Sequence, residues 1–298
     1  MPSKPEIGAN ESGFIIVPVL WIIAALVSLT IIYSLYARET ALNFVDHDER
    51  LQAAALTESA VELAAYQLTA QADSQPLQGQ FSFRQGSATV TAHFRCENSL
   101  IDLNFAPQTV LAGFFVGVGV QPDDATAFAE RIMAWRSNLR PGSSDSEAEL
   151  YRQYGRGYGP RHGAFQDISE LGLVAGLPAA LIDRVLPYFT VYSGQPEVNV
   201  LAAPSQVLAA LPGLTPERLQ TLLSIRANAP QDIMRAQLGM TQSYITLNAS
   251  RANRVSVAVQ FASGRRTQAQ IDIFLLPRDK EPYRVLAWRE NTPWGSDN

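Results

Sequence analysis

The stretch NESGFIIVPVLW, residues 10–21, places a single glycine between a polar leader and a long apolar run. Residues 14–36 carry no charged side chain. At ~1.5 Å of rise per residue, a helix of this length extends roughly 35 Å, enough to cross a hydrocarbon core of ~30 Å. A secretory signal peptide has a shorter apolar stretch and a small-residue cleavage site, whereas here Arg38 and Glu39 follow the run. We therefore expect a single membrane anchor over residues 14–37.

The bulk composition sets further bounds. A chain of 298 residues exceeds the usual size of one domain, so two folding units are expected. The formal net charge of −5 argues against nonspecific binding to nucleic acids, which relies on Lys and Arg to neutralise phosphates. The sequence has a single cysteine, Cys96, which excludes an intrachain disulfide and leaves the cellular compartment open.

The sequence after the anchor predicts a long helix followed by a β-sheet. Apolar residues recur at helical spacing and no Pro or Gly lies between Pro18 and Pro76, so we expect one helix of about 55 residues. The segments FSFRQ and ATVTAHFR then alternate in polarity around Gly86 and Ser87, which is typical of a β-hairpin. Three later segments predict that the sheet resumes after about residue 250: RVSVAVQFA, QAQIDIFLLP and YRVLAWRE.

The middle of the chain, from about residue 104 to 240, reads as short helices broken by Gly and Pro. The segment DDATAFAERIMAWRSNL predicts a helix capped by Asp123 or Asp124. The segments LVAGLPAALIDRVL and ALPGLTPERLQTLL share an apolar-x-Gly-Leu core followed by a helix, so that Gly176 aligns with Gly213. This is typical of paired helix-hairpin-helix elements, in which glycine permits the tight turn between the helices.

The position of Gly13 is similar to that in a type IV prepilin leader. In that family a prepilin peptidase cuts after the glycine on the cytoplasmic side, and the resemblance implies Phe14 as the first mature residue. Pilins usually carry Glu at the fifth mature position, where this chain has Pro18. Proline is tolerated in a first helical turn. It also avoids placing a carboxylate in the bilayer, which costs at least a few kcal/mol.

Four segments resemble, in their order along the chain, those of the protein K family of type II secretion systems, the largest minor pseudopilins. They are LIDLNFA, PRHGAFQDISELGLV, PEVNVLAAPSQVLAALPGL and PYRVLAWRE. The resemblance implies an α+β fold, in which a long N-terminal transmembrane helix leads into a pilin-like antiparallel sheet. A large all-helical insertion with helix-hairpin-helix-like elements interrupts this sheet. The implied parts are a leader (1–13), a transmembrane segment (14–37), a first pilin-like part (38–103), the insertion (104–242) and a second pilin-like part (243–298).

The same resemblance implies a role and a location. The chain is expected to be a minor pseudopilin at the tip of a type II secretion pseudopilus, supporting its assembly and protein export across the outer membrane. It would be a single-pass protein of the bacterial inner membrane with its C-terminal domain in the periplasm. The implied partners are other minor pseudopilins, the prepilin peptidase and the inner membrane, with no nucleic acid.

A calcium site is the one metal site that the resemblance raises. The family often shows an Asp-Trp-x-Asp-x-Asp run, and calcium is reported among its members. Here the equivalent run is AWRSNL, in which the three acids are absent. Calcium needs 6–8 oxygen ligands, and the acids that remain nearby are Asp145, Glu147 and Glu149. We expect a solvated acidic loop, with a retained calcium site as the alternative and no other cofactor.

Other functions find less support in the sequence. It holds no His-Glu-x-x-His, Gly-x-Ser-x-Gly or phosphate-binding loop, and GVG at residues 117–119 lacks the later glycine of a dinucleotide site, so we expect no enzyme. We expect the segment YGRGYGPRHG to be a surface loop, with stacking on single-stranded nucleic acid as the alternative that its Gly, Tyr and Arg content suggests. A membrane-anchored DNA-binding protein remains the alternative function, although the turn LPGLTPE offers a Glu and the turn AGLPAAL offers no charge. An ordinary single-pass enzyme or receptor would need a site that the sequence does not show.

Overall fold

The computed structural model describes residues 16–70, 75–138, 146–226, 244–277 and 279–290. The chain divides into two compact units, residues 1–55 and residues 56–298. The predicted sheet segments and the predicted insertion both lie in the second unit.

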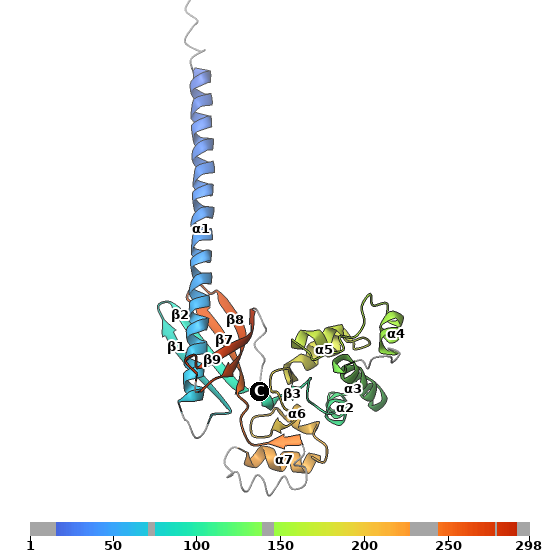
Figure 1. Cartoon of the computed structure of the whole chain (residues 1–298). Helices are drawn as coiled ribbons and strands as arrows, with labels where there is room; N and C mark the ends of the chain where they lie inside the picture. Colours follow the sequence, from blue (N-terminus) through green and yellow to red (C-terminus); the bar gives the residue numbers. More distant parts are fainter. Residues whose placement is uncertain (1–15, 71–74, 139–145, 227–243, 278, 291–298) are drawn as a thin grey trace, which may run out of the picture. The chain divides into compact units, whose positions relative to one another are not determined.

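A single helix, α1, spans Ile16–Thr69 with 54 residues, which confirms the predicted long helix (Figure 1). Its segment Ile16–Ala37 is long and apolar enough to cross a membrane, with a mean hydropathy of 2.5, and none of it is buried inside the protein. Exposed apolar surface of this extent is unfavourable in water. The segment therefore fits the predicted membrane anchor.

The second unit contains a five-stranded antiparallel sheet in the order β1-β2-β7-β8-β9. The predicted hairpin is confirmed, with Gly86 at a φ of 59° in its turn. The sheet resumes after the insertion, as predicted, because β7 pairs with β2 along the whole length of β2. The strands are β1 (Gln78–Gln85), β2 (Ala88–Cys96), β7 (Ala252–Phe261), β8 (Arg266–Leu275) and β9 (Tyr283–Glu290).

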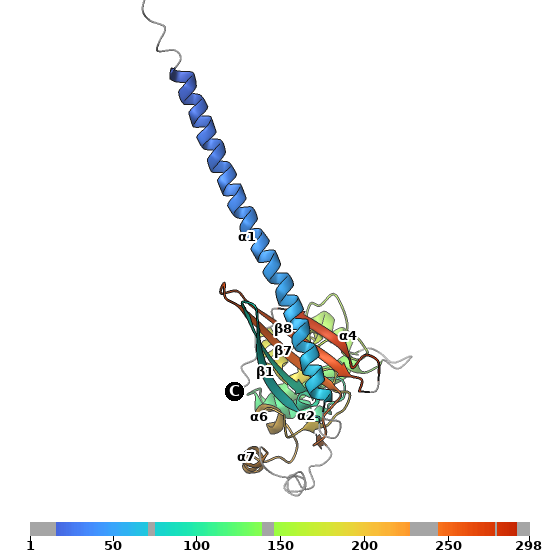
Figure 2. The same cartoon turned by 90° about the vertical axis from the view of Figure 1, so that its left-hand side faces the viewer.

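The C-terminal turns of α1 cross one face of this sheet in both views (Figures 1 and 2). Ala60, Ala64 and Leu68 are buried on the helix and lie four residues apart, so they share one face. Val257 and Ile271 are buried on the sheet, on the face where successive strands present alternate residues. Alternation in the strands and the helical period in α1 thus bury one common core.

The insertion lies between β2 and β7 and folds mainly as short helices (Figure 1). The expected α+β class is confirmed, with one correction: the insertion is not all-helical, because β3 pairs with β4 and β5 pairs with β6 in parallel. These pairs satisfy the backbone groups of buried extended segments, which have no helical partners. Its helices are η1 (Glu97–Ser99), α2 (Gln108–Gly117), α3 (Pro122–Arg136), α4 (Ser146–Gln153), η2 (Ile168–Leu173), α5 (Ala179–Val185), η3 (Leu186–Tyr188), α6 (Ser205–Ala209) and α7 (Pro216–Ile225), and its strands are β3 (Ile101–Asp102), β4 (Phe189–Thr190), β5 (Val198–Asn199) and β6 (Ile245–Thr246).

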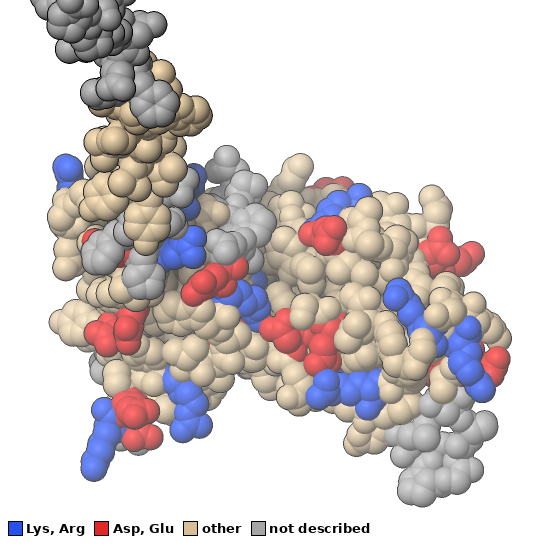
Figure 3. Space-filling view, turned by 90° about the horizontal axis from the view of Figure 1, so that it is seen from above, with Lys and Arg blue, Asp and Glu red and all other residues tan. Residues whose placement is uncertain are grey.

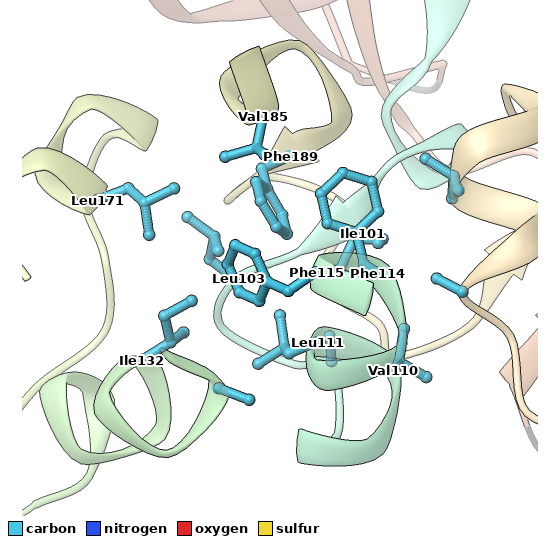
Figure 4. Close-up of a cluster of buried hydrophobic side chains, with 14 of the residues drawn as sticks. Ile101, Leu103, Val110, Leu111, Phe114, Phe115, Ile132, Leu171, Val185 and Phe189 are labelled. Carbon is cyan, nitrogen blue, oxygen red and sulfur yellow. The ribbon is translucent and has the colours of Figure 1, made fainter. Parts of the chain in front are cut away.

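An apolar core holds these short elements together, as Figure 4 shows. Phe114 of α2 meets Phe189 of β4 edge-on, with ring centroids 5.0 Å apart. Phe115 meets Phe128 of α3 in the same way at 5.6 Å. Short helices are marginal on their own, so this shared burial is what stabilises the insertion.

The start of α3 differs from the prediction. Gln121 precedes the helix and Pro122 occupies its first turn, so the predicted caps Asp123 and Asp124 lie inside the helix. Proline is favoured at this position because its missing N–H would have no partner there anyway. The two acids still lie at the positive end of the helix dipole.

Candidate functional site

A group of ion pairs lies where the insertion meets the sheet. We call them the junction ion pairs (Glu97, Arg254, Asp272, Arg289 and Asp167). Arg254 of β7 contacts Glu97 of η1, with 2.7 Å between Nε and Oε1, and Asp272 of β8, with 3.3 Å between Nε and Oδ1. Arg289 of β9 contacts Asp272 at 2.6 Å and Asp167, just before η2, at 2.7 Å. The junction ion pairs thus connect three strands of the sheet with two parts of the insertion.

Three of the junction ion-pair residues, Glu97, Arg254 and Asp272, are buried. Burial raises the pKa of Glu97, and the charge of Asp272 adds to this shift while Arg254 opposes it. For Arg254, burial alone would lower the pKa, but the carboxylates of Glu97 and Asp272 outweigh burial and raise it. Removing one partner would leave an uncompensated buried charge, which typically costs about 3–5 kcal/mol. The junction ion pairs therefore fix the insertion on the sheet.

Two polar side chains of the LIDLNFA motif form hydrogen bonds where the chain enters the insertion. The Asp102 carboxylate accepts hydrogen bonds from Asn104 N at 2.8 Å, Ser193 Oγ at 2.8 Å and Gly194 N at 3.0 Å. The Asn104 amide exchanges two hydrogen bonds with the backbone of Phe165, at 2.9 and 2.7 Å. Burial raises the pKa of Asp102, while the Ser193 hydroxyl opposes this shift. These bonds tie segments that lie far apart in the sequence.

A second group of polar side chains forms hydrogen bonds where the chain leaves the insertion. Asn98 and Asn199 both donate from Nδ2 to the carbonyl of Asn248, at 2.9 and 3.0 Å. Ser250 N donates to Asn98 Oδ1 at 3.2 Å. The sequence singled out the segments that contain Asp102 and Asn199 without assigning these residues a role. The sequence signal that could have indicated their role is a polar residue within an apolar run. Such a residue is buried with its neighbours and therefore needs hydrogen-bond partners.

The two predicted hairpin glycines both adopt the left-handed conformation. Gly176 has a φ of 79° and Gly213 a φ of 81°. At Gly176 a second constraint exists, since an added Cβ would lie 1.7 Å from Nη1 of Arg131. Arg131 donates to the carbonyl of Ala175 at 3.3 Å, and its guanidinium lies 5.2 Å from the ring centre of Tyr154. The space beside the turn at Gly176 is thus occupied by the Arg131 side chain.

The predicted cleavage site falls on Gly13 and Phe14, which lie outside the described residues. Pro18 is described, as an exposed residue in the first turn of α1 that the structure records. A proline there removes no hydrogen bond within this turn. The helix therefore accommodates proline at the position where pilins usually carry Glu.

The candidate calcium ligands are brought together only in part. Glu147 and Glu149 both lie in the first turn of α4, whereas Asp145 lies outside the described residues. Glu149 forms an ion pair with Arg152 one turn later. Within the described part of the chain, no three His, Cys, Asp or Glu side chains are grouped so that they could hold a metal ion.

Cys96, at the end of β2, is fully buried. Burial raises the pKa of its thiol to about 12, and the neighbouring Glu97 adds to the shift. A thiol with such a pKa is protonated at neutral pH and is a weak nucleophile. Cys96 therefore packs as a small apolar side chain.

Comparisons with known proteins agree with this arrangement. Residues 98–194 match the family model of type II secretion system (T2SS) protein K. The type II secretion system protein K of Klebsiella pneumoniae is 31% identical over 122 residues, which are 40% of this chain and 37% of that protein. The chain thus aligns with somewhat more than a third of this curated relative. The resemblance to protein K that the sequence motifs indicated is confirmed.

A solved structure shares the fold over most of the chain. One chain in the crystal structure of the GspK-GspI-GspJ complex, from the type 2 secretion system of enterotoxigenic Escherichia coli, matches with a TM-score of 0.63. The match has 15% sequence identity and covers 83% of this chain and 98% of that one. At this identity the likeness concerns the fold alone.

Proposed function

We propose that this chain, which carries the protein K domain of type II secretion systems, is a minor pseudopilin at the tip of a periplasmic pseudopilus. In this role it supports assembly of the pseudopilus and protein export across the outer membrane. The observation that carries the proposal is the insertion of residues 97–251 between two central strands of a sheet headed by an apolar helix. Such a bulky addition would hinder the stacking of further subunits above it.

The anchor supports a location in the inner membrane. The apolar segment of α1 is the one candidate span among the described residues, and it lies near the N-terminus. Cleavage after Gly13 would leave this span attached to the second unit, which would then face the periplasm. Pro18 supports a terminal position in the fibre, because a subunit without the usual carboxylate cannot pair it with the amine of a subunit above.

The proposed partners are other minor pseudopilins and the prepilin peptidase. The likeness to a chain from a complex of three such proteins supports the first of these. The protein itself would do no chemistry, in keeping with the secretion-system proteins that it resembles. The junction ion pairs would keep the insertion fixed on the sheet while the subunit is extracted from the membrane.

The mature N-terminus tests the proposal. We expect mass spectrometry of the protein, extracted from cells with an active prepilin peptidase, to show loss of residues 1–13 and Phe14 as the first residue. Cells without this peptidase should retain the leader, and Gly13→Glu should block the cut. An intact leader in peptidase-containing cells, or a cut after Ala37, would contradict the assignment.

The alternative of a membrane-anchored DNA-binding protein gains no support from the hairpins. Phosphate binding by such elements needs free backbone N–H groups at the turn, usually with nearby cations. Arg131 occupies the place where an added Cβ of Gly176 would lie and is bonded to Ala175 and Tyr154. Arg218 Nη1 donates to the carbonyl of Gly213 at 3.5 Å, so both cations at the turns are engaged within the protein. On the face seen in Figure 3, Lys and Arg are interspersed with Asp and Glu, so this face presents no basic field.

A further inference from the structure

The Gly- and Tyr-rich segment YGRGYGPRHG, which the proposed function leaves unexplained, contributes to an exposed aromatic surface on the insertion. We call it the tyrosine surface (Arg131, Tyr154, Arg156, Tyr158 and Leu173). Tyr154, Tyr158 and Leu173 are 49%, 39% and 44% exposed. Tyr158 OH donates to the carbonyl of Leu173 at 3.2 Å, so these residues are neighbours although 15 positions separate them. Isolated exposed apolar residues are common, but exposed aromatic rings gathered on one short segment often mark a binding site.

Both exposed rings are held in place by the protein. The ring of Tyr158 meets that of the buried Tyr151 edge-on, with 5.9 Å between centroids. The hydroxyl of Tyr154 accepts a hydrogen bond from Arg131 at 3.2 Å, and Arg131 is itself bonded to the backbone of Ala175. Side chains ordered in advance lose little conformational entropy when a partner binds. The tyrosine surface is therefore preorganised for binding a partner.

The surface also carries two cations. The guanidinium of Arg131 lies 5.2 Å from the ring centre of Tyr154, and that of Arg156 lies 6.0 Å from the ring centre of Tyr158. Among the residues that the structure describes, neither arginine has a carboxylate within ion-pair distance. The nearby Arg161, in contrast, pairs with Glu170 at 2.7 Å. Carboxylates supplied by a partner would complement the two remaining cations.

Two glycines of this segment, Gly155 and Gly157, differ in whether their backbone conformation requires glycine. Gly155 has a φ of 67°, which glycine adopts at little cost. Gly157 has no positive φ, and an added Cβ would meet no atom within 4 Å. Neither its conformation nor its packing therefore explains the glycine. A glycine at such a place allows close approach of another backbone.

We propose that the tyrosine surface binds an extended acidic segment of a partner protein. Aromatic-lined surfaces are used to bind extended peptides, and Arg131 and Arg156 would pair with the carboxylates. Single-stranded nucleic acid stacks on the same kinds of group and is therefore the ligand against which the acidic peptide is compared. This proposal goes beyond the tip role and does not depend on it.

The test uses the full-length protein in detergent and a fluorescent ten-residue peptide of alternating Glu and Pro, which is extended and acidic. Fluorescence anisotropy should show saturable binding. The corresponding Lys-Pro peptide and a ten-nucleotide thymidine strand should bind at least tenfold more weakly. No saturable binding of the acidic peptide, or equal binding of either comparison ligand, would overturn the proposal.

Variants assign the binding to this surface. We expect Arg156→Glu and Gly157→Val each to weaken binding of the acidic peptide at least tenfold and to leave the melting temperature unchanged. Arg266→Glu, which changes an exposed arginine on β8, is the matched control and should bind as the wild type does. Wild-type affinity in Arg156→Glu or Gly157→Val would show that the surface is not the site. A melting temperature several degrees lower for Gly157→Val would show that the fold requires this glycine, which also overturns the argument.

Discussion

At the scale of single residues, Gly176 combines a backbone requirement with a packing requirement. Its φ of 79° is costly for an L-residue, and an added Cβ would displace the Arg131 guanidinium from Ala175 and Tyr154. We expect Gly176→Ala to destabilise the second unit by about 1–2 kcal/mol through the backbone, with about 1 kcal/mol more from the lost hydrogen bonds. Urea unfolding followed by circular dichroism would measure this.

Gly264 supplies the control for that experiment. It has a φ of 93°, but an added Cβ would meet no atom within 4 Å. Gly264→Ala should therefore show the backbone cost alone. Equal losses in Gly176→Ala and Gly264→Ala would mean that Arg131 moves aside freely, and the packing part of the argument would be wrong.

At the scale of elements, the sequence predicted what periodicity encodes. The 54-residue helix, the hairpin at Gly86 and the three late strands all follow from spacing and turn chemistry. The two-residue strands β3–β6 are too short for any period to reveal them. The hairpin glycines were located from the repeated Gly-Leu pattern, but the stacking of Arg131 on Gly176 was not, because it depends on tertiary packing.

The junction ion pairs were not predicted, for a physical reason. Arg254 and Asp272 lie at positions of their strands that point away from α1, where a charged residue normally indicates a solvent-exposed face. The insertion covers that end of the face, and both side chains become buried. Glu97 is 157 positions away from Arg254, so no local pattern links them.

The link between Asp167 and Arg289 gives a pH-dependent prediction. Burial alone would raise the pKa of Asp167, but the hydrogen bonds from Ser169 and the Arg289 guanidinium outweigh it and lower this pKa. The contribution to stability is therefore present above the unfolded value of about 3.9 and is lost as the pH falls through the lower folded value. Asp167→Asn should cost about 1 kcal/mol at pH 7, because the pair is partly exposed.

Urea midpoints at pH 7 and near pH 3 would test this, with Asp183→Asn, an exposed site on α5, as control. The difference between wild type and Asp167→Asn should shrink at the lower pH. The control should differ little from the wild type at both. A difference that stays constant with pH would show that the charge of Asp167 is not what stabilises the link.

The loop between α3 and α4 is the element on which calcium binding depends. Three acids of the family run are replaced here, and Glu149 pairs with Arg152. We propose a solvated acidic loop and expect the same melting temperature for the full-length protein in excess calcium and in EGTA. A rise of several degrees in calcium that Glu147→Gln abolishes would instead establish a retained site, since a ligand bound to the folded state stabilises it.

At the scale of the whole molecule, the proposed tip position gives a prediction about Pro18. A tip subunit has no neighbour above whose amine a carboxylate at this position would neutralise. Pro18→Glu would therefore place an unpaired carboxylate in the membrane segment, at a cost of about 2.5–3.5 kcal/mol near the bilayer centre and less near its surface. We expect reduced co-purification of the full-length variant with its companion minor pseudopilins. Pro18→Gln removes the proline without adding a charge and should assemble as the wild type does, which separates the effect of charge from that of helix geometry. If Pro18→Glu assembles better and occurs along the fibre shaft with its insertion intact, the insertion does not restrict the subunit to the tip, and the tip assignment is wrong.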